Sequence, residues 1–176
     1  GISKLTPLKD AWRHFRFMLL YSPTYLFLIP GGVLFILGLV FLVLFIPGRF
    51  ELFGHRFDIH AMVFASLFSI LGFQIINLGV YGKTYALLEG YEKEDKALGR
   101  FYKIFNLEKG IAAGSGLLIL GVIIIGYIIS RWANTGFGEL SEARRAIFAL
   151  TVIIIGIQII FSSFFLSMMF IQKRKI

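Results

Sequence analysis

Residues 25–46 read YLFLIPGGVLFILGLVFLVLFI and carry no charged side chain. A helix of about 20 apolar residues can cross the roughly 30 Å hydrocarbon core of a bilayer, so this stretch predicts a membrane-spanning helix. Pro30, Gly31 and Gly32 lie inside it. Because proline cannot donate a backbone hydrogen bond, we expect a kink or a local widening there, with a neighbour satisfying the freed carbonyl.

Three further stretches have the same character: Ala61–Gly82, Ile111–Ser130 and Ala146–Ile171. Hydrophobic residues make up 57% of the chain and charged residues 16%, whereas soluble domains are about a quarter charged. The sequence therefore predicts an all-α membrane protein with four transmembrane helices. Cysteine is absent, which excludes disulfides, thiolate metal sites and cysteine nucleophiles.

The charges between the spans predict the orientation. Thirteen basic residues fall on one side, namely Lys4, Lys9, Arg13, Arg16, Lys83, Lys93, Lys96, Arg100, Lys103, Lys109, Lys173, Arg174 and Lys175. Five fall on the other side, namely Arg49, Arg56, Arg131, Arg144 and Arg145. Because cytoplasmic segments are enriched in Lys and Arg, both termini and the middle loop are expected in the cytoplasm. The net charge of +8 is then expected to face anionic lipid rather than nucleic acid.

The outer loop at residues 48–60, GRFELFGHRFDIH, predicts a short β-hairpin on the outer interface. Phe50, Leu52, Phe57 and Ile59 alternate with polar residues around Gly54, which is the pattern of two short strands joined by a turn. The loop also holds His55, Asp58 and His60. Histidines in such a turn are more often interfacial than ligands, so we predict no metal site.

The two halves of the chain resemble each other. Phe53-Gly54 recurs as Phe137-Gly138, and LGFQII at 71–76 recurs as IGIQII at 155–160, both 84 residues later. GVLFILG at 32–38 is echoed by GLLILG at 116–121. Chance similarity between Ile-, Leu- and Gly-rich helices is the alternative explanation. A duplication predicts two tandem helical hairpins, related by an axis along the membrane normal.

Basic amphipathic segments flank the spans on the predicted cytoplasmic side. One lies in residues 1–22, with Thr6 and Pro7 suited to a helix start, and another within residues 95–108. We expect both to lie flat on the leaflet. Their charges either contact lipid headgroups in general or bind a phosphorylated lipid, since arginine fits phosphate bidentately. The candidate lipid-phosphate-binding residues are Lys4, Arg13, Arg16, Lys83, Arg100 and Lys103.

Polar residues inside the spans are neutral. They are Gln74, Asn77, Thr151, Gln158, Ser162 and Ser163, and they are expected to form interhelical hydrogen bonds; the alternative is a lining for a lipid groove. No Asp, Glu, Lys, Arg or His lies in the middle of a span. Ion-coupled transport, proton relays and voltage sensing generally need such groups, so the sequence argues against them.

At its start, SKL followed by DAWRHFRFMLLYSP (10–23), the chain resembles family-2 polyprenyl-phosphate glycosyltransferases of the dolichol-phosphate-mannose-synthase type. FLIPG (27–31), FDIH (57–60) and GIQIIFSSFFLS (156–167) also resemble the membrane region of that family. The resemblance implies transfer of a sugar from a nucleotide sugar to polyprenyl phosphate, with a divalent metal, Mg or Mn, bound by an Asp-x-Asp motif in a catalytic domain. This sequence lacks that motif, so the resemblance implies a fragment: residues 1–22 end the catalytic domain and carry the first interfacial helix, and residues 23–176 form the membrane domain.

The expected function is therefore to anchor the enzyme and position the lipid-phosphate acceptor, with no catalytic residue and no cofactor in this part. The expected partners are polyprenyl phosphate, anionic lipid, the catalytic domain and a further copy of the chain, and the expected location is a prokaryotic plasma membrane. A small four-helix transporter or lipid-linked-sugar flippase is the alternative. A structural subunit that tethers a partner is a third hypothesis.

Overall fold

A computed structural model describes residues 11–12, 24–48, 51–52, 55–56, 59–89, 106–136 and 142–173. Its helical elements are η1 (Thr24–Leu28), α2 (Ile29–Leu44), α3 (Ile59–Leu88), α5 (Leu107–Asn134) and α6 (Ala143–Lys173). With η1 and α2 joined, four helices are long and apolar enough to cross a membrane. The four predicted spans are thereby confirmed, and the chain is an integral membrane protein. Both predicted interfacial helices stay predictions. Within residues 1–22 the structure describes only Ala11 and Trp12, and residues 95–105 lie outside the described part.

The first span widens where the sequence contains proline. Residues Thr24–Leu28 form a π-helical turn, and α2 begins at Ile29 with Pro30 in its first turn. A π-helical turn carries one more residue per hydrogen-bonded ring, which gives room for the proline ring next to the preceding carbonyl groups. The expected local widening is therefore found directly before Pro30.

Between α2 and α3 the chain forms a very short antiparallel strand pair, β1 (Glu51–Leu52) and β2 (His55–Arg56). Glu51 pairs with Arg56 and Leu52 with His55. The pair lies where the sequence predicts a hairpin, but it is only two residues long on each strand. Its position at the outer interface stays a prediction.

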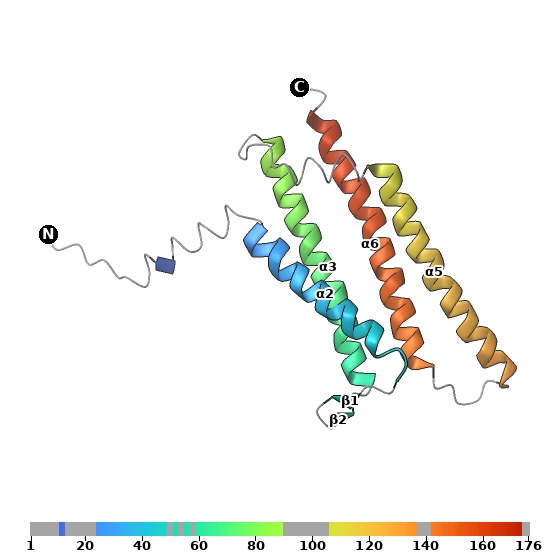
Figure 1. Cartoon of the computed structure of the whole chain (residues 1–176). Helices are drawn as coiled ribbons and strands as arrows, with labels where there is room; N and C mark the ends of the chain where they lie inside the picture. The colour runs from blue at the N-terminus through green and yellow to red at the C-terminus, as the bar shows by residue number, and fades with distance from the viewer. Residues whose placement is uncertain are drawn as a thin grey trace.

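The four spans stand in a row rather than in a closed bundle. The principal contacts join α2 to α3, α3 to α6, and α6 to α5 (Figure 1). α2 and α3 form one antiparallel hairpin, α5 and α6 form the other, and α3 and α6 run in the same direction at the centre of the row. Most large apolar side chains on the flanks of the row are exposed, as expected for surfaces that contact lipid.

Glycines set the close approach of helices inside each hairpin, and they do so at repeated positions. A Cβ added to Gly72 would lie 2.8 Å from the Gly31 carbonyl oxygen, and one added to Gly156 would lie 2.7 Å from that of Gly114. One added to Gly38 would lie 2.8 Å from the Ala65 carbonyl oxygen. The matching contact at Gly121 involves Ala149, at 2.9 Å. The same backbone contacts recur 83 to 84 residues later, so the two hairpins are duplicates in their packing as well as in their sequence.

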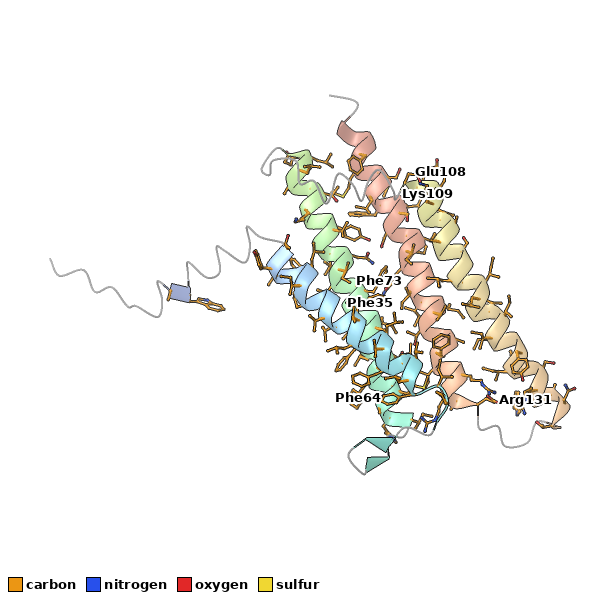
Figure 2. All side chains as sticks on the ribbon, in the orientation of Figure 1. Phe35, Phe64, Phe73, Glu108, Lys109 and Arg131 are labelled. Atoms are coloured by element: carbon orange, nitrogen blue, oxygen red, sulfur yellow. The ribbon has the colours of Figure 1, made fainter. Side chains whose placement is uncertain are left out.

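Aromatic and aliphatic side chains fill the space beside these glycines. The rings of Phe35 and Phe73 lie 5.6 Å apart between α2 and α3 (Figure 2). Leu42, Phe45, Met62 and Ala65 form a buried cluster at the end of the hairpin that carries β1 and β2. Ile147 and Phe148 of α6 pack against that cluster. The first hairpin is thus fixed to the second at the predicted outer end.

Candidate functional site

The predicted cytoplasmic end of α3 holds a buried basic residue. Lys83 is 8% exposed, although α3 continues to Leu88. At a rise of about 1.5 Å per residue, Lys83 lies about 14 Å from the middle of the helix. Half the hydrocarbon thickness is about 15 Å, so if the middle of α3 lies at the bilayer centre, the Lys83 backbone lies near the depth where the hydrocarbon meets the headgroups.

Lys83 lies on the side of α3 that faces the start of the first span. It follows Gly79 by one helical turn, and a Cβ at Gly79 would meet Phe27 and Leu28 of η1 at 2.8 Å. The next residue, Thr84, is fully buried, and its hydroxyl donates to the Val80 carbonyl at 2.6 Å. A lysine stem can pack against apolar side chains while its ammonium group reaches the interface. This arrangement suits an anionic headgroup at the boundary.

Lys83 is the member of the candidate phosphate-binding set that the structure describes. Lys4, Arg13, Arg16, Arg100 and Lys103 lie outside the described residues. At the same end of the molecule, Glu108 and Lys109 occupy the first turn of α5 (Figure 2). Both are exposed, so Lys109 offers a comparison with buried Lys83.

Hydrogen bonds between described residues join the hairpins within the predicted spans. The hydroxyls of Ser66 and Thr151 lie 2.6 Å apart, and Tyr81 donates to Ser162 at 2.6 Å. The Tyr81 ring also meets the edge of Phe165, with centroids 4.7 Å apart. Sequence reasoning missed Ser66 and Tyr81. Ser66 precedes Thr151 by 85 residues, so the internal repeat placed these two side chains at nearly the same level of equivalent helices.

The other polar residues of the spans differ from the expected interhelical bonding. Ser163 donates to Ile159 of its own helix at 2.7 Å. The Gln158 side-chain oxygen is buried and accepts no hydrogen bond from the described residues. Gln74 is exposed, Asn77 is half-buried, and within the described part of the chain neither is seen to bond across helices. The expectation that polar residues inside the spans form interhelical hydrogen bonds is therefore met only in part.

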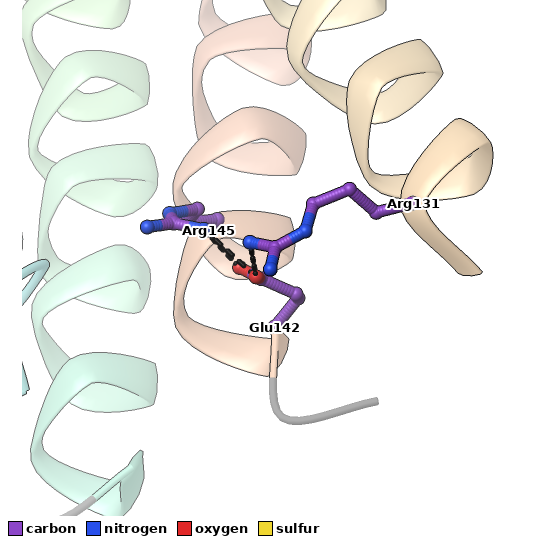
Figure 3. Close-up of polar contacts among 3 residues, drawn as sticks. All are labelled: Arg131, Glu142 and Arg145. Carbon is purple, nitrogen blue, oxygen red and sulfur yellow. Dashed lines mark hydrogen bonds and ion pairs between the residues drawn. The ribbon is translucent and has the colours of Figure 1, made fainter. Parts of the chain in front are cut away.

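Charged residues at the opposite end link the helix termini (Figure 3). The Glu142 carboxylate accepts from Arg131 at 2.9 Å and from Arg145 at 2.6 Å. Arg144 donates to the Phe45 carbonyl at 3.4 Å. These contacts connect the end of α5 to the start of α6, and the start of α6 to the end of α2. Arg131, Arg144 and Arg145 therefore have structural roles.

Comparison with known proteins assigns the chain to a family. The model of the glycosyltransferase family 2 C-terminal transmembrane region matches residues 80–170, which cover the end of α3, α5 and nearly all of α6. The chain belongs to this family. The matched residues of this glycosyltransferase family 2 transmembrane region include Lys83, Tyr81 and Ser162.

A relative supports the same assignment. The family 2 transmembrane region described here is 34% identical over 166 residues to the low-salt glycan biosynthesis hexosyltransferase Agl6 of Haloferax volcanii. The alignment covers 94% of this chain and 40% of Agl6, so the chain spans less than half of that relative. No solved structure matches.

Proposed function

We propose that the chain is the membrane domain of a glycosyltransferase that transfers a sugar from a nucleotide sugar to a polyprenyl phosphate. The observation that carries the proposal is the match to the glycosyltransferase family 2 transmembrane region. The similarity to a hexosyltransferase supports a hexose as the transferred group. The domain anchors the enzyme and holds the acceptor phosphate at the cytoplasmic boundary.

The placement of Lys83 supports this acceptor. A polyprenyl phosphate has a long apolar chain and an anionic head, so it lies with its phosphate where hydrocarbon meets water. A lysine whose stem is packed against protein holds its ammonium group in place at the boundary, where it attracts the phosphate more strongly than a fully solvated lysine does, because less water screens the attraction. In this proposal Lys4, Arg13, Arg16, Arg100 and Lys103 supply further basic groups from the segments next to the spans.

The chemical contribution of this domain is positioning. The acceptor phosphate oxygen attacks the anomeric carbon of the sugar, and the nucleoside diphosphate leaves. Holding the two reactants in line removes much of the entropic part of the barrier. The proposal assigns the divalent metal to the nucleotide-sugar-binding domain, as the resemblance to family-2 glycosyltransferases implies.

The test compares two lysines at the same end of the molecule. Lys83→Met keeps the length and apolar character of the stem and removes the charge, and Lys109→Met does the same at an exposed position. In nanodiscs, we expect Lys83→Met to weaken polyprenyl-phosphate binding about tenfold or more, because a charge-assisted contact is lost. We expect Lys109→Met to stay within about twofold, as is usual for exposed charges.

Polyprenol without phosphate is the ligand control. Equal binding of polyprenol and polyprenyl phosphate would contradict the proposed acceptor, and equal affinity of the Lys83→Met and parent proteins would remove Lys83 from the site. Movement of a lipid-linked sugar across the bilayer of protein-containing liposomes would instead support a flippase.

A further inference from the structure

The two hairpins contact each other through different faces of equivalent helices. On α6, Thr151 and Ser162 face α3 and are 1% and 9% exposed. Their equivalents 84 residues earlier on α3 are Leu67 and Leu78. These two leucines are 43% and 51% exposed, so the α3 copy of this docking face has no helix against it in the described structure.

The face of α3 that meets α6 also has a repeat equivalent on α6, and that equivalent is exposed. On α3, Ser66 and Tyr81 face α6 and are half-buried. Their equivalents on α6 are Leu150 and Phe165, which are 52% and 43% exposed. Leu150 marks the open face, and Phe165 marks its edge, because the Phe165 ring also meets that of Tyr81. The contact between the hairpins is therefore heterologous: one face of α3 meets a different face of α6, and among the described residues no helix packs along the matching face of either one.

The two open faces match each other in chemistry. The Ser66–Thr151 pair corresponds to Leu150 and Leu67, so both hydroxyls are replaced by leucine together. The Tyr81–Ser162 pair corresponds to Phe165 and Leu78, so the donor and the acceptor are again lost together. Each of these two hydrogen-bonded pairs thus has an apolar pair as its counterpart, so the two open faces could pack together without leaving a hydroxyl unpaired.

Gln74 adds an independent reason for a protein partner on the open face of α3. It lies at the centre of α3, between Leu67 and Leu78 in the sequence and one turn before the latter, and it is exposed. Within the described residues it makes no hydrogen bond that would satisfy its amide. An amide at mid-membrane depth is costly in hydrocarbon, and glutamine side chains there bond across helices.

We infer that a second copy of this chain covers these faces, with α3 of each copy docked on α6 of the other. Adjacent residues on a helix are about 100° apart around its axis. Ser66 marks the face of α3 that is used within the chain and Leu67 the face that is open, so the two faces differ by about this angle. In a closed ring of four hairpins, each inner helix contacts two neighbours, and the directions to these neighbours differ by roughly 90°. Two copies therefore close the ring, with α3 and α6 inside and α2 and α5 outside.

The first experiment uses disulfide cross-linking in intact membranes, since the chain has no cysteine of its own. Copies with Leu67→Cys are co-expressed with copies carrying Leu150→Cys, and oxidation is expected to give a covalent dimer. Either variant alone is expected to give little, because a heterologous contact does not bring a residue next to its own copy. Leu67→Cys with Ile123→Cys, which is 62% exposed on α5, is the collision control.

The double variant tests closure. Leu67→Cys with Leu150→Cys in one chain is expected to stop at a dimer with two disulfides, and a ladder of larger products would overturn the ring of two copies. Ser66→Cys with Thr151→Cys should form a disulfide inside one copy, which shows that the hairpins are folded. If that internal disulfide forms while Leu67→Cys and Leu150→Cys fail to join, or join only to another protein, the inference is wrong.

The second experiment measures self-association by energy transfer between labelled copies in vesicles. Gln74→Leu is expected to raise the dimer dissociation constant about 3- to 20-fold, the range measured for interhelical hydrogen bonds in membranes. The control is Leu120→Gln, which places an amide on exposed α5 outside the ring. An unchanged dissociation constant for Gln74→Leu, or an equal effect of Leu120→Gln, would contradict the role of Gln74.

Discussion

Tyr81 makes two contacts with α6, one polar and one aromatic. Its hydroxyl donates to Ser162 at 2.6 Å, and its ring meets the edge of Phe165. In a membrane there is little water to replace a lost bond, yet measured interhelical bonds contribute only about 0.6 to 2 kcal/mol, because the separated helices also find partners. Tyr81 is therefore expected to adjust the contact between the hairpins and not to decide it.

Tyr81→Phe tests this expectation. The substitution keeps the ring contact with Phe165 and removes the donor to Ser162, so we expect the free energy of unfolding in bicelles to fall by about 0.6 to 1 kcal/mol. Tyr127→Phe on α5, where the parent side chain is 54% exposed, is the control and should change it by less than about 0.5 kcal/mol. A loss of several kcal/mol for Tyr81→Phe would mean that the hydroxyl has a larger role than one bond.

At the scale of the element, each hairpin depends on glycines that let two backbones touch. A Cβ at Gly72 would lie 2.7 Å from the Phe35 Cα and 2.8 Å from the Gly31 carbonyl oxygen. Both are backbone atoms, so a side-chain rotation cannot remove the clash. By contrast, nothing lies within 4 Å of a Cβ at Gly126.

Gly72→Ala is therefore expected to push α2 away from α3. Overpacking of this kind costs about 1 to 3 kcal/mol, and Gly156→Ala should cost a similar amount in the second hairpin because it meets Gly114 and Leu118 in the same way. Gly126→Ala, the control, should not destabilise and can stabilise by up to about 1 kcal/mol, because alanine has the higher helix propensity. Unfolding of the three variants in one detergent or bicelle system measures this. A neutral Gly72→Ala would contradict the close approach.

The whole molecule is a row of four helices with basic groups at both ends, and the proposed function depends on which end faces the cytoplasm. The described charges at the predicted outer end include the arginines bonded to Glu142. At the other end, Lys83 lies near the hydrocarbon boundary and Lys109 is exposed at the start of α5. The proposed function requires the orientation that puts Lys83 on the cytoplasmic side.

Labelling of single cysteines with a membrane-impermeant maleimide tests the orientation. In intact cells, Asn134→Cys at the end of α5 is expected to react, and Lys109→Cys is expected to react only after the membrane is permeabilised. Both parent residues are exposed, so access to the side chain does not limit the reaction. The reverse pattern would place both termini outside and would remove Lys83 from the cytoplasmic boundary.

The sequence by itself determined the four spans, the widening before Pro30 and the duplicated hairpin. These follow from length, apolar composition and repeated glycines, and a bilayer imposes the helical form on any such stretch because backbone groups find no other partners there. The resemblance to glycosyltransferase family 2 was also present in the sequence, and the match over residues 80–170 bears out that part of it.

Only the tertiary structure decided which face of each helix is covered. LGFQII and IGIQII are nearly identical, yet Gln74 is exposed while the Gln158 side-chain oxygen is buried. The local sequence cannot distinguish them, since both lie on equivalent positions of equivalent helices. They differ because the hairpins meet through unlike faces, so a repeat that is symmetric in sequence is placed in two unlike environments.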